Sequence, residues 1–139
     1  MAVSKRYAAR RLAVQALYQT QLNERDIETL LAQFRQDQGY PGADAEYFEG
    51  LLQDAFGARD MLDDDIRSYG DIAPEQLDPV ERAVLWVALT ELRLRADVPV
   101  RVVLNEAVEL AKQFGAEGGH RFVNGLLDQA AASLRAARA

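Results

Sequence analysis

Four cations and no acid occupy the first 23 residues of the chain: Lys5, Arg6, Arg10 and Arg11. Guanidinium groups suit phosphates, and their planes can also stack on bases. Arg6 and Arg10 are spaced at helical intervals from Ala13 and Leu17, so all four share one helix face. Buried unpaired arginines are costly. We therefore expect the first turns of this helix to extend beyond the core and to present their cations to solvent.

A solvated helix end is the alternative interpretation of this basic segment. Through the helix dipole, acids rather than bases stabilise a helix N-terminus. The cations here run against that preference, which favours an anionic partner.

Candidate catalytic and metal-binding groups are few. His120 is the only histidine and lies between glycine and arginine, which is more typical of a helix start or a packing residue than of a base. The acids 63–65 are consecutive, and helical neighbours point about 100° apart, so they do not converge as ligands and we expect a solvated face. The chain has no cysteine, which excludes a disulfide, a thiolate metal site and a thiol nucleophile. We predict a protein that is not an enzyme and has neither cofactor nor metal.

Length and composition fit one ordinary domain, 1–139, because 49% of the 139 residues are apolar. No segment is long and apolar enough to cross a membrane or to act as a secretion signal, and we expect a cytoplasmic protein. The net charge of −6 is unevenly distributed. Residues 1–23 carry +4; residues 24–81 hold 16 acids and 4 bases; residues 82–139 hold 8 bases and 6 acids. This asymmetry predicts one end for an anionic partner and an acidic middle that is solvated or faces a basic partner.

The apolar periodicity is helical nearly everywhere and predicts an all-α fold of six or seven helices. Residues 39–42 form the clearest break, and no segment has the pattern of a strand. Asp78 and Pro79 indicate a helix start, with Glu81 placed for a capping box. The following helix, to about Leu94, is apolar on most sides and should be central and buried. Gly115 is a natural residue to end the next helix.

Several blocks of the sequence resemble the NusB family of bacterial transcription antitermination factors. They lie in the first helix and in the second half of the chain, at 13–18, 79–85, 88–92, 97–99, 105–115 and 120–128. Residues 24–75 resemble the family mainly in helical pattern. The resemblance implies two packed helical subdomains. It also implies binding of boxA RNA together with NusE, a small-subunit ribosomal protein, within the RNA polymerase antitermination complex of ribosomal RNA operons.

The resemblance also assigns roles to individual residues. It implies RNA contacts for Lys5, Arg6, Arg10, Arg11, Tyr18, Phe122 and Asn124, and NusE contacts for Glu81 and, more weakly, Glu75. Tyr18 and Phe122 would stack on bases, although aromatics at helical spacing are more often core residues. Asn124 could read a base edge, or Asn124-Gly125 could be a close-packing point. Glu81 could be a surface acid, a capping residue, or both.

Two departures from the family pattern and two alternatives remain. The basic start is split into Lys5-Arg6 and Arg10-Arg11, and Gly118-Gly119 replaces a more polar stretch. One alternative is a protein-binding scaffold, and the other is a domain related to those attached to ribosomal RNA methyltransferases. Some family members form homodimers through the region that RNA uses. We predict that replacing Arg6 and Arg10 by Ala weakens RNA binding and leaves the fold nearly intact.

Overall fold

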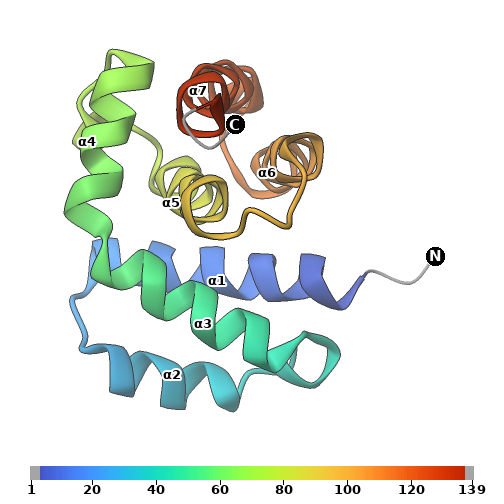
Figure 1. Cartoon of the computed structure of the whole chain (residues 1–139). Helices are drawn as coiled ribbons and strands as arrows, with labels where there is room; N and C mark the ends of the chain where they lie inside the picture. Colours follow the sequence, from blue (N-terminus) through green and yellow to red (C-terminus); the bar gives the residue numbers. More distant parts are fainter. Residues whose placement is uncertain (1–3, 137–139) are drawn as a thin grey trace.

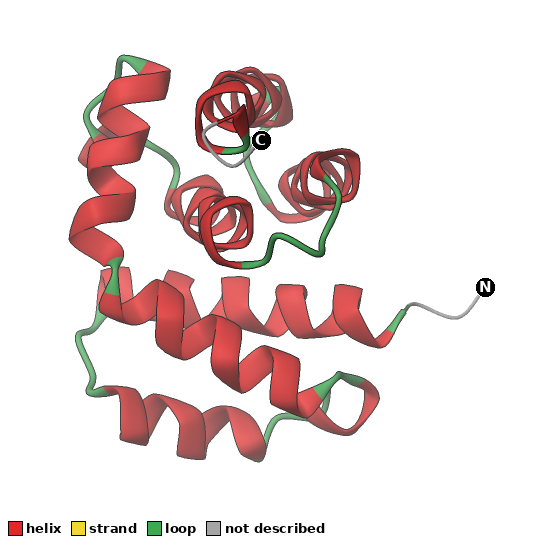
Figure 2. Ribbon diagram, in the orientation of Figure 1, coloured by secondary structure: helices red, strands yellow, loops and turns green. Residues whose placement is uncertain are grey.

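The computed structural model describes residues 4–136, and these form seven α-helices and no strand (Figures 1 and 2). This confirms the predicted all-α class. Two single-turn 3-10 helices, Tyr40–Gly42 and Pro74–Gln76, lie in the connections. The α-helices are α1 (Lys5–Leu22), α2 (Ile27–Arg35), α3 (Ala45–Gly57), α4 (Arg59–Gly70), α5 (Pro79–Leu94), α6 (Val100–Phe114) and α7 (Gly119–Leu134).

The helices form two packed groups, as the resemblance implied. In Figure 1, α1, α2 and α3 lie across the view, whereas α5, α6 and α7 are seen nearly end-on and α4 runs along one side. Helix α5 packs against α1 and α3 of the first group and against α4, α6 and α7 of the second. It therefore joins the two groups. None of the helices in residues 4–136 combines the length and the apolar content needed to cross a bilayer.

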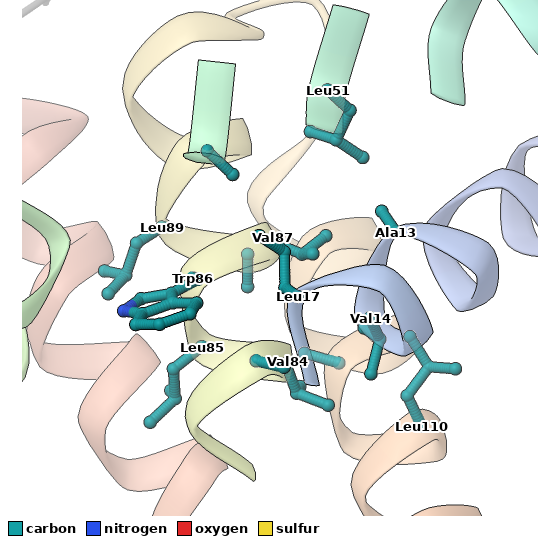
Figure 3. Packing of buried hydrophobic residues seen from close by; sticks show 14 of the residues in the cluster. Ala13, Val14, Leu17, Leu51, Val84, Leu85, Trp86, Val87, Leu89 and Leu110 are labelled. Carbon is teal, nitrogen blue, oxygen red and sulfur yellow. The ribbon is translucent and has the colours of Figure 1, made fainter. Parts of the chain in front are cut away.

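The core surrounds α5, as its nearly continuous apolar sequence predicts. Leu85, Leu89 and Leu92 have no exposed surface, and each such side chain contributes about 1.5–3 kcal/mol to stability. Figure 3 shows the α5 side chains together with Leu17 of α1 and Leu51 of α3. A helix that is apolar on most sides needs neighbours on most sides. The crossing of the two helical groups provides them.

Local capping residues fix most of the helix starts. Ser4, Asp26, Asp44 and Asp78 each accept a hydrogen bond from a backbone N–H in the first turn of the helix that follows. The predicted cap at Asp78 is thus confirmed, with 2.8 Å to the N–H of Val80. Helices α4, α6 and α7 start without a side-chain cap, and the N-cap of α7 is Gly118.

Candidate nucleic-acid interface

Five cations make no side-chain ion pair or hydrogen bond within residues 4–136. They are Lys5, Arg11, Arg101, Lys112 and Arg121. Lys5 and Arg11 lie on α1, Lys112 lies in the last turn of α6, and Arg121 lies in the first turn of α7. Arg101 lies in the first turn of α6, at the opposite end of that helix from Lys112. Helix α1 and the end where α6 meets α7 therefore hold most of the cations without an ion pair.

An aromatic groove of about 450 Å³ opens beside α1. Arg11, Gln15 and Tyr18 line it from one helix face because they are spaced at i, i+4 and i+7. Tyr18 is half-buried and packs against the core while still lining the groove, so the core and surface interpretations both hold for it. The opposite wall includes Phe114, the last residue of α6, which is 44% exposed.

Phe114 was not predicted as a site residue. Its position continues the apolar stripe of α6, and the sequence alone assigns it to the core. A signal was nevertheless present, because Phe114 directly precedes the helix-ending Gly115. The last residue of an apolar stripe often passes the edge of the core.

A polar groove of about 500 Å³ lies between α6 and α7. Lys112, His120, Arg121 and Asn124 line it, so Asn124 lies beside two unpaired cations. Asn124 and Gly125 are both exposed, and a Cβ at Gly125 would meet no atom within 4 Å. The interpretation of Asn124-Gly125 as a packing point between helices is therefore wrong.

The two grooves flank the C-terminal turn of α6. Phe114 lines the aromatic groove and Lys112, two residues earlier, lines the polar groove. The hydroxyl of Tyr7 on α1 donates to Oε1 of Gln113 at 3.0 Å, which ties this turn to α1. The structure thus places Arg11, Tyr18 and Asn124 around one helix end.

Phe122 lies apart from both grooves. A Cβ added at Gly70, the last residue of α4, would be 3.0 Å from Cζ of Phe122. The ring therefore packs between α7 and the end of α4, and it is half-buried against the core. Its placement is what the core interpretation predicts, and the structure does not bring it together with Tyr18.

Arg10 is buried, so the expectation that it faces solvent is wrong. Its residue is 3% exposed, and Nε donates to both carboxylate oxygens of Glu91 at 2.8 and 3.0 Å. Its Nη1 bonds to Glu106, and the Tyr47 hydroxyl donates to Glu91. Burial alone would lower the pKa of Arg10, but the charges of Glu91 and Glu106 outweigh it and raise that pKa. We call Arg10, Tyr47, Glu91 and Glu106 the buried charge cluster.

Of the remaining cations of the basic start, Lys5 and Arg6 are exposed and Arg11 is half-buried beside the aromatic groove. The Arg6 side chain is 46% exposed and lies 4.0 Å from Asp44 and 3.9 Å from Asp97, so both ion pairs are loose. Its guanidinium carbon lies 4.2 Å from the centre of the Tyr47 ring. Lys5 is exposed in the first turn of α1. Of the four predicted basic contacts, three can thus reach a ligand.

Glu81 is not a surface acid. It is 5% exposed, and its Oε2 accepts the Ala116 N–H at 2.9 Å, in the turn between α6 and α7. Burial raises the pKa of Glu81, and this hydrogen bond opposes the rise. The side chain does not bond back to Asp78, so the reciprocal half of the predicted capping box is absent from the described hydrogen bonds. Glu75, in contrast, has a side chain that is 64% exposed and lies 3.5 Å from Arg67.

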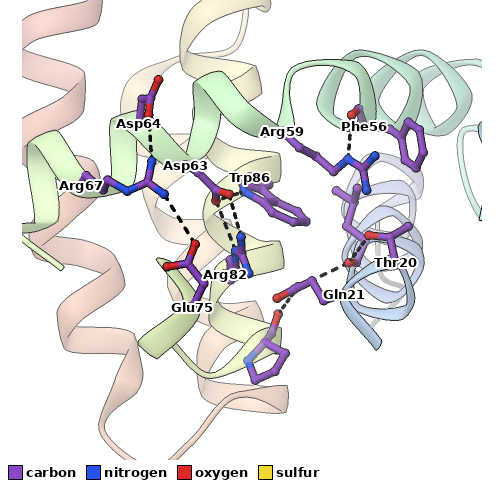
Figure 4. Close-up of polar contacts among 12 residues, drawn as sticks. Thr20, Gln21, Phe56, Arg59, Asp63, Asp64, Arg67, Glu75, Arg82 and Trp86 are labelled. Carbon is purple, nitrogen blue, oxygen red and sulfur yellow. Dashed lines mark hydrogen bonds and ion pairs between the residues drawn. The ribbon is translucent and has the colours of Figure 1, made fainter. Parts of the chain in front are cut away.

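The acids 63–65 do not form the solvated face that we expected. Asp63 accepts two hydrogen bonds from Arg82, at 2.6 and 3.2 Å, and one from Nε1 of Trp86 at 2.9 Å (Figure 4). Asp65 is likewise buried and pairs with Arg93 at 2.6 Å. Only Asp64 is exposed. Consecutive helical positions point in different directions, and two of the three point at arginines of α5.

The comparison with protein families shows to which family this chain belongs. The model described as the NusB family matches residues 7–132. The chain belongs to the NusB family. It is 48% identical over 134 residues to the transcription antitermination protein NusB of Pseudomonas putida (strain W619), covering 96% of this chain and 81% of that protein. It is 46% identical over 129 residues to the NusB of Shewanella amazonensis (strain ATCC BAA-1098 / SB2B), covering 93% and 96%.

Solved NusB structures share the fold. The chain matches T. maritima NusB with a TM-score of 0.79 and 31% identity, over 94% of each chain. It also matches a chain in the crystal structure of the antitermination factors NusB and NusE in complex with dsRNA. That TM-score is 0.81 at 27% identity, over 91% of this chain and 96% of the other.

Proposed function

We propose that this NusB-family chain is a transcription antitermination factor that binds boxA RNA together with NusE in the RNA polymerase antitermination complex. We infer a binding protein rather than an enzyme, with residues 1–139 acting as one RNA-binding domain. The observation that carries the proposal is the aromatic groove with unpaired Arg11 at its edge, next to the polar groove with unpaired Lys112 and Arg121.

This surface combines the two features that bind unpaired nucleotides. Aromatic rings stack on bases for about 1–3 kcal/mol per base, and cations track the phosphates. Tyr18 and Phe114 supply the rings, and Asn124 supplies donors and acceptors for a base edge. The net charge of −6 gives little attraction elsewhere on the chain. Binding should therefore be local and should depend on a partner.

We infer that NusE adds the remaining affinity. A NusB of the same fold is found with NusE and dsRNA in one structure. A ribosomal protein should be basic, and Glu75 is an exposed acid on this chain. An ion pair between an exposed acid and a basic partner mainly speeds the association of the two proteins. Glu75→Gln should therefore lower the association rate with NusE more than it raises the dissociation rate.

The decisive experiment measures RNA binding by fluorescence anisotropy, with boxA RNA and a scrambled RNA, each with and without NusE. We expect weak, salt-sensitive binding by the chain alone and tighter, boxA-selective binding with NusE. Equal affinity for both RNAs in both conditions would refute the proposal. Sedimentation of the same samples counts the copies in each complex, because a homodimer through this surface would compete with RNA.

Arg11→Ala and Arg101→Ala form a matched pair, since both residues lack an acidic partner in residues 4–136 and only Arg11 lines a groove. Losing one phosphate contact on single-stranded RNA lowers the salt slope by about 0.7. We expect that change for Arg11→Ala and none for Arg101→Ala. Tyr18→Ala should weaken binding by about 5- to 150-fold, and Tyr18→Phe should retain most of it, since the stacking face remains. Equal effects of both Arg variants would place the RNA elsewhere.

A further inference from the structure

The carboxylate of Glu81 reaches from the first turn of α5 into the turn between α6 and α7. There Oε2 accepts the Ala116 N–H at 2.9 Å. We call residues 115–119 the α6–α7 turn. The buried acid in this turn comes from α5, which starts 36 residues before the turn begins. Because Glu81 is only 5% exposed, this acid is part of the packed structure.

Two glycines make room for the Glu81 side chain. A Cβ at Gly115 would lie 2.9 Å from Oε2 of Glu81 and 2.7 Å from the carbonyl oxygen of Ala111. A Cβ at Gly119 would overlap both carboxylate oxygens of Glu81. Gly118 between them has φ +80°, a left-handed conformation that favours glycine. The glycine-rich turn therefore matches the position of one carboxylate.

The start of α7 has no side-chain cap of its own. Its N-cap Gly118 makes no side-chain hydrogen bond, and its first turn contains no acid. Glu81 lies against Gly119, the first residue of α7, while its hydrogen bond goes to the Ala116 N–H in the turn. An acid on α5 thus holds the turn that leads into α7.

The α6–α7 turn connects the two proposed RNA-binding grooves. His120 and Arg121 follow it and line the polar groove, while Phe114 precedes it and lines the aromatic groove. Val80, the neighbour of Glu81, also lines the aromatic groove. The Glu81 carboxylate thus bonds to the turn that joins residues of both grooves.

We propose that Glu81 is a positioning residue that holds the α6–α7 turn from α5 and sets the alignment of the two grooves, rather than a surface contact for NusE. The effect on RNA rests on the proposed function, whereas the role in holding the turn does not. Holding the turn needs a hydrogen-bond acceptor of the right shape, and a docking role needs a negative charge. Glutamine keeps the acceptor and removes the charge, so it separates the two.

The first experiment compares Glu81→Gln with Glu81→Ala in the full-length chain. Hydrogen exchange of the Ala116 amide should speed up by about 2- to 30-fold in Glu81→Ala, a range similar to that for losing a side-chain acceptor at a helix start, and change little in Glu81→Gln. With NusE present, boxA affinity should follow the same order, with an unchanged salt slope. If Glu81→Gln binds NusE as poorly as Glu81→Ala while Ala116 stays protected, Glu81 is a direct charge contact and the proposal is wrong.

The second experiment is a double-mutant cycle with Gly119→Ala, followed by thermal unfolding. Gly119→Ala should lower Tm in the wild-type background, because the new methyl group displaces Glu81. It should have little effect in the Glu81→Ala background, where the space is empty. Gly125→Ala is the control and should not lower Tm, since Gly125 lies in open space on the same helix. Equal Tm losses in both backgrounds would overturn the role of Glu81 in holding the turn, even if boxA binding proved absent and the proposed function failed.

Discussion

Replacing Arg10 by Met should destabilise the chain strongly, in contrast to what the basic start of the sequence predicts. The side chains of Arg10 and Glu91 are 4% and 1% exposed. Removing the guanidinium leaves the Glu91 carboxylate with the Tyr47 hydroxyl as its remaining side-chain donor. Breaking a buried pair in this way costs about 3–5 kcal/mol. Because a whole domain is stable by about 5–15 kcal/mol, the loss is a large share of the total.

Urea unfolding at constant temperature measures this loss, with circular dichroism and the fluorescence of Trp86 as two probes. Tm should fall by about 10–20 °C for a chain of this size. Arg11→Met is the matched control, because it lies next along the same helix and has no ion pair among the described residues. That variant should change the free energy of unfolding by about 0.5 kcal/mol or less.

The pH dependence tests the cause of the loss. Burial raises the pKa of Glu91, and Arg10 opposes that rise. Without Arg10 the pKa of Glu91 in the folded state rises further above its unfolded value. Such a group favours the folded state below the unfolded pKa, and this advantage is lost as the pH rises through the folded pKa. Arg10→Met should therefore be less destabilised at pH 5 than at pH 8.

A compensated variant completes the test. Arg10→Met with Glu91→Leu and Tyr47→Phe removes the charges and the hydroxyl together, and it should recover most of the lost stability, because buried pairs often add little over apolar packing. If Arg10→Met instead loses less than about 1 kcal/mol and loses RNA affinity, with a lower salt slope, then Arg10 is a surface phosphate contact. That result would refute the buried charge cluster.

Two further predictions concern acids outside the cluster. Asp63→Ala should cost about 2–3 kcal/mol in urea unfolding, because a paired arginine and the Trp86 Nε1–H lose their acceptor, while the exposed Asp64→Ala should cost little; equal losses would contradict it. The pKa of Glu49 is lowered to about 2 by the hydrogen bond from Arg35. The contribution of this pair to the free energy of unfolding is therefore present above pH 4.5 and disappears as the pH falls toward 2. Since this pair is partly exposed, Arg35→Gln should remove only a small part of the stability at pH 7. In the same variant, a carboxyl titration by NMR should show the Glu49 pKa return toward 4.5.

Most of the fold could be predicted from the sequence because its helices carry strong local signals. The apolar run after Asp78 predicts both the start of α5 and its central position, and both are confirmed. The boundary between α3 and α4 is different. Only Ala58 separates them, and it provides no side-chain cap. Where the chain turns without a cap or a proline, the packing of α4 against α5 and α7 sets the boundary, and that information is not local.

The candidate site could be predicted in its residue types but not in the direction of each side chain. Helical spacing correctly places Arg10 on the core-facing stripe of α1, yet it cannot show that Glu91 lies opposite, 81 residues later. A signal was present, because Glu91 interrupts an apolar run just as Arg10 interrupts an apolar stripe. Two opposite charges, each on a face that must be buried, predict a pair. Glu81 offers no comparable signal, since its glycine partners are typical of any turn.

The net charge of a chain segment does not show which of its charges face solvent, because many of them form ion pairs with residues far away in the sequence. Residues 24–81 carry 16 acids against 4 bases, which on its own indicates an acidic body. Many of these acids instead pair with arginines, some from beyond residue 81: Asp54 with Arg95, Asp63 with Arg82 and Asp65 with Arg93, as well as Glu49 with Arg35. The cations that remain without an ion pair or side-chain hydrogen bond in the described residues are few, and four of them lie on α1 or where α6 meets α7. Four such contacts on single-stranded RNA would give a salt slope of about −3. A measured slope far steeper than this would mean that the ion pairs open when RNA binds.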